Sequence, residues 1–325
     1  MGILQKITIA IFTRVGIGRV SKMKAKQLSL DQVPGMLVST QNSPVRFEIP
    51  EEMIKLMKEG ANLKIHQRFP MRTMLSNMKN INLSVDSLAE NPKGPSMSAT
   101  PKFLETLKEY IHSIGIDILE FVKLPRDLIF QGAGVIYDNA IVLAMEMSEE
   151  KIDLAPSQET MDMVMDTYNS LGIAANRIAE FLREHGFASQ ADHPLGGLVL
   201  FPPLAQKAGI GWVGRHGLLI TPQFGSRVRL AAVYTSIQNL PFVDSNAHSW
   251  IDDYCKECGL CIEQCPSNAI LHEAEVHESG RITRVIQKLC FEYFVQYYGC
   301  SVCIKACPFS KAGNTYERLK ELKTN

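Results

Sequence analysis

The first 254 residues of this 325-residue chain contain no cysteine, and all eight cysteines lie between Cys255 and Cys307. Disulfides form in oxidising compartments. Cysteines confined to one short stretch instead indicate metal or cluster ligands, which require reduced thiols. We therefore expect a cytoplasmic protein.

An excess of either charge is also missing, since 34 lysines and arginines balance 34 aspartates and glutamates. A neutral chain has no overall attraction to nucleic acid or to an anionic membrane. At the N-terminus the apolar run Ile7–Phe12 is too short to cross a bilayer, and we see no signal peptide there. We expect a surface or buried helix, with peripheral membrane contact as the alternative.

The bulk composition, 46% hydrophobic and 21% charged, is typical of a soluble globular protein long enough for two domains. We expect an N-terminal helical or irregular extension over residues 1–99, a core over 100–242 and a cysteine-containing domain over 243–325. Val243–Trp250 is the expected linker.

The cysteines form two similar motifs, each ending in a Cys-Pro pair. The first has the spacing C-x2-C-x2-C-x3-C and comprises Cys255, Cys258, Cys261 and Cys265. The second has the spacing C-x9-C-x2-C-x3-C and comprises Cys290, Cys300, Cys303 and Cys307. In bacterial two-cluster ferredoxins the fourth cysteine of each run ligates the other cluster. We therefore assign one [4Fe–4S] cluster to the first three cysteines with Cys307, and another to Cys290, Cys300, Cys303 and Cys265.

Zinc binding and disulfide formation are the two other uses open to these cysteines. Zinc sites usually have paired C-x2-C knuckles without a third cysteine and a Cys-Pro ending, and disulfides would need an oxidising compartment. The wide gap in the second motif is expected to hold a helical insert, Phe291–Tyr298.

Helix and strand patterns alternate from Thr100 onward. Thr100 is a plausible N-cap with Pro101 at the first helical position, and a long helix follows Pro156-Ser157 and stops at Gly186. The expected strands are Ile116–Val122, Ala140–Met147 and Phe187–Ala191, and then Leu218–Thr221 paired with Val228–Tyr234. Before Thr100 the periodicity is weak. There we expect a helix over Glu51–Lys58 and a polar loop over Asn80–Ser98. The alternation predicts an α/β or α+β sandwich ahead of the cysteine domain.

Residues 208–230, AGIGWVGRHGLLITPQFGSRVRL, resemble the superfamily of reductive dehalogenases and epoxyqueuosine reductases. The preceding Pro203-Leu204-Ala205 and the ferredoxin motif behind strengthen the resemblance, which covers roughly residues 100–310. It implies an α+β fold: a nitroreductase-like, cobalamin-binding sandwich core followed by a two-cluster ferredoxin domain. Neither a twin-arginine signal nor the helical repeats of many epoxyqueuosine reductases is visible.

The resemblance also implies roles for particular residues. Tyr168, in the long helix, matches a proton donor beside the corrinoid, although it also suits a core aromatic. Asp192 stands at the end of a strand where the family has a polar residue facing the substrate, although it also suits a loop cap. One of Arg227 and Arg229 resembles the active-site cation, with a surface or phosphate contact as the alternative.

Corrinoid binding rests mainly on the resemblance, because the methyltransferase-type motif D-x-H-x-x-G is absent. The family binds the cofactor base-off, without a histidine ligand from that motif. Glycine lets backbone approach a flat macrocycle closely, and four glycines are candidates for that contact: Gly209, Gly211, Gly214 and Gly217. They serve equally well as tight packing turns.

The function that these features indicate is an oxidoreductase of the reductive dehalogenase type. A low-potential ferredoxin or flavodoxin would supply electrons, and the two clusters would pass them to the corrinoid for cleavage of a small-molecule substrate. One alternative is a non-catalytic electron-transfer protein that reduces a partner enzyme. The other is an epoxyqueuosine reductase acting on tRNA, which the neutral charge makes an unlikely partner.

Overall fold

The computed structural model describes residues 26–27, 29–47, 52, 55–56, 70–278, 280–311 and 313–324. The expectations for Ile7–Phe12, including peripheral membrane contact, lie outside these ranges. Of the helix expected over Glu51–Lys58, only residues 52, 55 and 56 are described, and they are helical. Within the described ranges, none of the helices has the length and apolar character that a membrane crossing requires.

The core of the protein is a four-stranded antiparallel sheet with the strand order β2-β4-β8-β5. Its strands are β2 (Ile118–Lys123), β4 (Asn139–Glu146), β8 (Val228–Thr235) and β5 (Ser189–Asp192). The central strands β4 and β8 are buried along almost their whole length. Both faces of the sheet are therefore covered.

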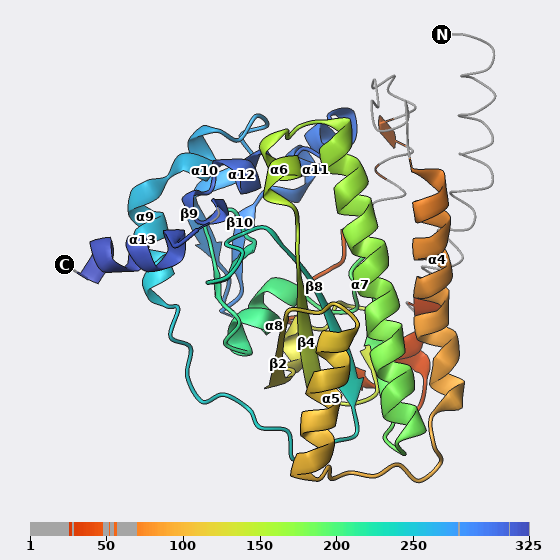
Figure 1. The fold of residues 1–325 in the computed structure, drawn as a ribbon. Helices are drawn as coiled ribbons and strands as arrows, with labels where there is room; N and C mark the ends of the chain where they lie inside the picture. Colours follow the sequence, from red (N-terminus) through yellow and green to blue (C-terminus); the bar gives the residue numbers. More distant parts are fainter. Residues whose placement is uncertain are drawn as a thin grey trace.

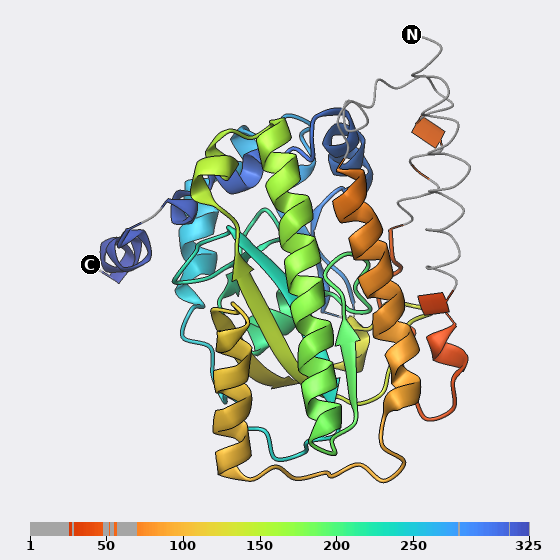
Figure 2. The same ribbon diagram turned by 45° about the vertical axis from the view of Figure 1, so that its right-hand side comes forward.

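Helices α5 (Pro101–Ser113) and α7 (Gln158–Glu184) cover one face of the sheet, and Figure 2 shows them in front of it. Both helices begin at capping residues. Thr100 Oγ1 accepts a hydrogen bond from the Phe103 N–H at 3.2 Å, and Ser157 Oγ accepts one from the Thr160 N–H at 3.1 Å. These caps satisfy N–H groups that have no partner within a helix.

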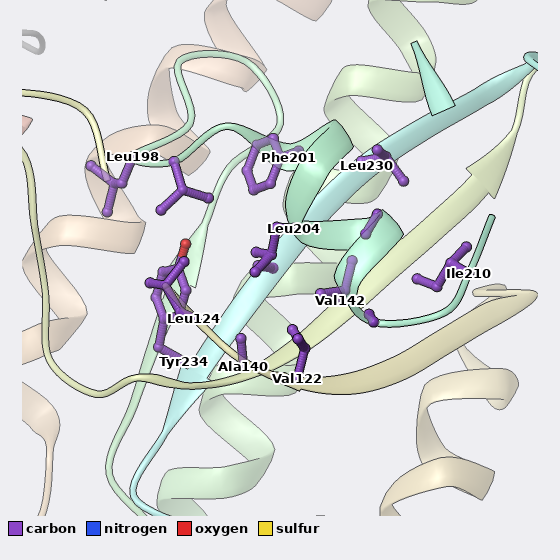
Figure 3. Close-up of a cluster of buried hydrophobic side chains, with 14 of the residues drawn as sticks. Val122, Leu124, Ala140, Val142, Leu198, Phe201, Leu204, Ile210, Leu230 and Tyr234 are labelled. Carbon is purple, nitrogen blue, oxygen red and sulfur yellow. The ribbon is translucent and has the colours of Figure 1, made fainter. Parts of the chain in front are cut away.

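The opposite face of the sheet packs against α8 (Phe201–Lys207). Figure 3 shows Leu204 of α8 above Val142 of β4 and Tyr234 of β8. Successive residues of a strand point to opposite faces. Even-numbered residues of β8 therefore lie on the α8 face, and odd-numbered residues lie on the α7 face.

A helix replaces the first part of the loop expected over Asn80–Ser98. Helix α4 (Met71–Asp86) lies along α7 (Figures 1 and 2). A 3₁₀ helix, Ser87–Glu90, follows it, and only the chain from Asn91 onward is irregular. Its polar side chains make hydrogen bonds to α7. Asn77 Nδ2 donates to Met165 O at 3.4 Å, and Ser84 Oγ donates to Asn176 Oδ1 at 3.1 Å. The expected loop was wrong because these polar residues face another helix, not solvent.

The expected pairing of Leu218–Thr221 with Val228–Tyr234 was also wrong. Strand β7 (Leu219–Ile220) pairs with β6 (Trp212–Val213), whereas β8 pairs with β4 and β5. A bridge between Thr221 and Gly225 closes the turn between β7 and β8. There Gly225, with φ 57°, lies so close to the Phe309 backbone that a Cβ would overlap it. The turn therefore packs against the cysteine domain.

The cysteine domain lies beside α6 (Glu149–Asp153) and the start of α7, at one end of the sheet (Figure 1). Lys305 Nζ donates a hydrogen bond to Ala155 O across this boundary at 3.2 Å.

Helix α11 begins four residues before the expected insert and carries Cys290 itself. The elements of the domain are α9 (Trp250–Cys258), α10 (Leu260–Glu263), β9 (Ile270–Val276), β10 (Ile282–Val285), α11 (Gln287–Gln296), α12 (Val302–Ala306) and α13 (Thr315–Thr324). The remaining short strands are β1 (Leu37–Val38) and β3 (Gly134–Val135).

Candidate functional site

The eight thiols fall into two groups, each of which combines both cysteine motifs. Burial, and then repulsion from Cys255 and Cys261, raises the pKa of Cys307 to about 12. Burial, and then repulsion from Cys300 and Cys265, raises the pKa of Cys290 to about 11. The fourth cysteine of each motif therefore lies near thiols of the other motif, and the assignment of the eight thiols to two clusters stays a prediction.

The spacing of the thiols bears on what they can hold. In the described ranges, no three His, Cys, Asp or Glu side chains converge tightly enough to hold a single metal ion. A cubane presents its four irons at separate corners, so its ligands surround a larger body than the ligands of one zinc ion do. None of the eight cysteines forms a disulfide, which leaves all of them free for ligation.

Backbone N–H groups bond to five of the eight sulfurs, those of Cys255, Cys261, Cys265, Cys300 and Cys307. The Ala269 N–H donates to Cys265 Sγ at 3.3 Å. The N–H groups of Ser301 and Val302 bond to Cys300 and oppose the burial that raises its pKa. This second contact depends on left-handed backbone, with φ 46° at Cys300 and 69° at Ser301. Such conformations are uncommon outside glycine and gather at functional sites, and N–H bonds to sulfur tune cluster potentials.

Tyr168 and Arg229 form a close pair between α7 and β8. The Arg229 guanidinium carbon lies 3.8 Å from the centroid of the Tyr168 ring. Arg229 Nη2 donates to Met147 Sδ at 3.2 Å, and Arg229 Nε is buried without a hydrogen-bond partner among the described residues. A guanidinium over the face of an aromatic ring is attracted to its π electrons. The pair therefore holds a phenol hydroxyl, which is a potential proton donor, beside a buried cation.

A predicted cluster ligand, Cys303, packs on the same group of buried residues as Tyr168. Tyr168 and Cys303 both pack on one group of buried residues between α6, α7 and α12, which we call the junction cluster: Met147, Ile152, Met163, Val164 and Ile304. Leu218 packs on it as well. The junction cluster thus brings together the predicted proton donor, the cation beside it and a predicted iron ligand.

Arg227 serves a different purpose from Arg229. Its side chain is 3% exposed and bridges the core to the cysteine domain. Nε donates to Ser310 O at 2.6 Å, while Nη1 donates to Met147 O at 2.8 Å and to Glu146 Oε1 at 2.5 Å. With these donors engaged, Arg227 is an anchor of the interface. The geometry therefore favours Arg229 as the predicted active-site cation.

Asp192 lies on the opposite face of the sheet from Tyr168. Its Oδ1 accepts the Leu198 N–H at 2.8 Å, and its Oδ2 accepts the Tyr234 hydroxyl at 2.7 Å. Figure 3 shows the Tyr234 oxygen directed away from the strand, toward the side where Leu198 lies. Burial raises the pKa of Asp192 to about 7 against these hydrogen bonds and the charge of Arg46. These contacts suit the loop-cap alternative, and they separate Asp192 from the Tyr168–Arg229 pair.

Two buried histidines, His193 and His216, were not predicted as site residues. In each, Nδ1 accepts the N–H of the residue two positions later, at 3.0 Å from Leu195 and 3.1 Å from Leu218. In each, Nε2 is buried with no partner among the described residues. Burial lowers the pKa of His193 to about 3 and that of His216 to about 4. The alternation of side chains along a strand could have identified His193. Because Asp192 points to the α8 face of the sheet, the next residue points to the α7 face, where Tyr168 lies.

The candidate cofactor glycines lie close to the protein's own chain. A Cβ on Gly211 would overlap the backbone of Ile220, and a Cβ on Gly214 would press on the Ile220 side chain. Gly209 and Gly217 have positive φ, 79° and 77°. The neighbours around Gly211 and Gly214 favour the packing-turn alternative, and macrocycle contact stays a prediction.

Comparison with known proteins shows what the chain is similar to. Residues 254–311 match the model of the 4Fe-4S dicluster domain. A tetrachloroethene reductive dehalogenase of Desulfitobacterium hafniense is 28% identical over 302 residues, which cover 86% of this chain and 52% of that protein. An epoxyqueuosine reductase of Listeria monocytogenes is 32% identical over 124 residues, which cover 33% of this chain and 29% of that protein. In sequence this chain is therefore similar both to reductive dehalogenases and to epoxyqueuosine reductases.

The fold of the dehalogenases is also shared. The solved structure of the catabolic reductive dehalogenase NpRdhA with 3-bromo-4-hydroxybenzoic acid matches 90% of this chain and 45% of that one, with a TM-score of 0.69 and 22% identity. The resemblance expected from residues 208–230 is confirmed, as are the α+β core and the C-terminal [4Fe–4S] ferredoxin domain. The chain spans about half the length of these dehalogenase relatives.

Proposed function

We propose that this chain is an iron–sulfur oxidoreductase of the reductive dehalogenase type. It passes electrons through two [4Fe–4S] clusters to a base-off corrinoid for the reductive cleavage of a small molecule. The observation that carries the proposal is the meeting of Tyr168, Arg229 and Cys303 at the junction cluster. It joins a proton source, a cation and a redox centre at one point.

The electron path follows from the grouping of the thiols. Cys303 belongs to the cluster with Cys265, Cys290 and Cys300, so that cluster is the one next to Tyr168. Repulsion from Cys261 contributes to the raised pKa of Cys303, after burial and the nearer thiols, so the two clusters are neighbours. A low-potential ferredoxin or flavodoxin would reduce the cluster of Cys255, Cys258, Cys261 and Cys307 first.

The residues near the junction cluster fit a large polar cofactor. Arg229 Nε and His216 Nε2 are both buried donors without a partner in the described chain, and Leu218, two residues beyond His216, packs on the junction cluster. These donors would hold amide or carbonyl oxygens of a corrinoid. When bound, a reduced corrinoid supplies the low-potential metal centre for cleavage of a carbon–halogen bond.

Side chains of this protein would then supply the proton that the reaction consumes. Tyr168 would give its hydroxyl proton to the carbon that loses its leaving group. Arg229, stacked on the ring, would stabilise the resulting phenolate. The substrate would be a small molecule, since one similar protein is a tetrachloroethene reductive dehalogenase and another was solved in complex with 3-bromo-4-hydroxybenzoic acid.

The test combines metal analysis with turnover. Protein purified without oxygen and offered cobalamin should hold about eight iron and about one cobalt per chain. With a reduced viologen it should dehalogenate members of a panel of halogenated phenols and ethenes. The Tyr168→Phe variant should keep its iron and lose turnover at least about a hundredfold, in the range of a lost general acid.

The Tyr110→Phe variant is the matched control, because Tyr110 of α5 stacks on Phe181 near the C-terminal end of α7, away from Tyr168. It should leave turnover unchanged. Full iron without retained cobalt would instead favour a non-catalytic electron-transfer protein. Equal turnover in wild type and Tyr168→Phe would remove the tyrosine from the mechanism.

A second candidate, epoxyqueuosine reduction, has one observation in its favour. The carboxyl of Asp192, with a pKa of about 7, can carry a proton at neutral pH and could act as the acid. Salt-dependent retention of a tRNA stem-loop would support this function. If the wild-type protein does not retain the stem-loop, the dehalogenase proposal stands alone.

A further inference from the structure

We propose that His193, and not Asp192, is the third side chain of the Tyr168–Arg229 site. Its Nε2–H would donate a hydrogen bond to the halide that leaves the substrate. This inference rests on the function proposed above and adds a specificity-determining group to it. Three observations support it: the face that His193 occupies, the gap it fills on α7, and the fixed position of its proton.

Strand geometry sends His193 toward α7. Asp192 pairs with Ala232 and bonds to Tyr234, so it lies on the α8 face. The next residue along the strand points to the other face. That face carries the odd-numbered residues of β8, among them Arg229. His193 and Arg229 therefore lie on the same side of the sheet.

Gly172 of α7 makes room for the imidazole. A Cβ at this position would overlap His193 Nε2 and its neighbouring ring carbons. Gly172 follows Tyr168 by four residues, and residues at this spacing have Cβ positions about 5–6 Å apart on a helix. His193 Nε2 thus occupies the place of a side chain that would neighbour Tyr168 on the same helical face.

The hydrogen bonds of the ring determine which nitrogen carries the proton. Nδ1 accepts the Leu195 N–H at 3.0 Å, so in the neutral ring the proton is on Nε2. Burial keeps the ring neutral by lowering its pKa to about 3. Nε2–H is consequently a donor. His193 is only 1% exposed, and its Nε2 has no hydrogen-bond partner among the described residues. Buried donors almost always have a partner, and a bound ligand would provide one.

The chemistry of the reaction identifies that ligand. Reductive cleavage of an aryl bromide is R–Br + 2 e⁻ + H⁺ → R–H + Br⁻, with electrons from the low-potential donor and the proton from Tyr168. The carbon–bromine bond breaks, and the bromide takes the electron pair of that bond. A neutral N–H beside the Arg229 cation stabilises the growing negative charge. The hydrogen bond strengthens as negative charge develops on the bromine, so the effect on turnover is expected mainly on kcat. A free bromide ion carries the full charge and should bind at the same place.

Two isosteric variants separate this role from a structural one. In His193→Asn, the side-chain oxygen can accept the Leu195 N–H as Nδ1 does, but the Nε2–H is gone. In His193→Gln, the amide nitrogen restores a donor near Nε2 and the bond to Leu195 is weakened. Exposed His185→Asn is the control for losing a histidine. Each protein is measured for iron content, for kcat and KM on the most reactive phenol, and for bromide binding by ⁸¹Br line broadening with oxidised clusters.

The expected result is that His193→Asn lowers kcat and weakens bromide binding by about tenfold each, the effect of one lost hydrogen bond, with iron unchanged. His193→Gln and His185→Asn should stay within about threefold of wild type. The reverse pattern, with Gln impaired and Asn intact, would overturn the inference by assigning His193 to loop structure alone. Bromide binding without turnover in wild type would overturn the function but retain the halide site, and absence of both would overturn the two together.

Discussion

Replacing Arg227 by methionine should loosen the cysteine domain from the core. Arg227 is 3% exposed, and its guanidinium reaches Ser310 O on one side of the interface and Met147 O on the other. Methionine keeps the apolar stem and removes the donors. Two buried carbonyls then lose their partner, while Glu146, 44% exposed, can return to water.

The expected cost follows from those groups. A buried polar group left without its partner costs about 1–3 kcal/mol, and removal of one member of a buried ion pair costs about 3–5 kcal/mol. The two figures overlap, and the exposure of Glu146 reduces the second. We therefore expect a loss of about 3 kcal/mol, a large share of the roughly 5–15 kcal/mol that stabilises a typical native domain.

Urea denaturation without oxygen would measure this loss. Far-ultraviolet circular dichroism follows the core, and visible absorption follows the clusters. In Arg227→Met the absorption transition should move to lower urea and precede the dichroism transition. Lys123→Met is the matched control, because it removes an exposed ion pair to Asp138 at 3.3 Å that contributes less than about 1 kcal/mol. A shift in Arg227→Met no larger than in the control would refute the assignment of Arg227 as the anchor.

Two further changes test the buried acid and the crossed clusters. Burial raises the pKa of Asp192 to about 7 from 3.8, so the folded state binds a proton that the unfolded state releases, and this group's contribution to stability falls as pH rises through that window. Relative to wild type, the free energy of unfolding of Asp192→Asn should therefore rise by roughly 2–3 kcal/mol between pH 5 and pH 8, at 1.36 kcal/mol per pKa unit. A difference in urea midpoints between the two proteins that does not change with pH would contradict the buried-acid interpretation. Cys307→Ser and Cys265→Ser should each lower iron from about eight to about four per chain. In Cys307→Ser the surviving cluster should be the one that Cys303 ligates. If spectroscopy shows that this cluster is the one lost, the assignment of the fourth cysteine of each motif to the other motif's cluster is refuted.

The sequence alone predicted the parts of this protein that depend on local chemistry. Cysteine spacing and the Cys-Pro endings predicted a dicluster ferredoxin domain, because a cubane restricts the distances among its ligands. Thr100 and Ser157 marked the starts of α5 and α7, because capping depends on neighbours three residues away. The glycine-rich stretch of residues 208–230 indicated the family.

Other features depended on contacts between segments far apart in the chain. Helix α4 has apolar residues at helical spacing, Met74, Met78, Ile81 and Val85. The polar residues between them, such as Asn77 and Ser84, hid that pattern, and only the packed structure shows that they bond to α7. The partner of β7 is β6 and not β8, and the turn after β7 packs at Gly225 against Phe309 of the distant cysteine domain. No local pattern contains these contacts.

The site shows the same division. The sequence supplied Tyr168, Arg227, Arg229 and Asp192 as chemically suitable side chains, and residue type alone could not rank them. The tertiary structure stacked Arg229 on Tyr168, engaged Arg227 at the domain interface and turned Asp192 to the opposite face of the sheet. The reason is geometric: chemical capacity belongs to a residue, whereas proximity and orientation arise only when strands and helices pack.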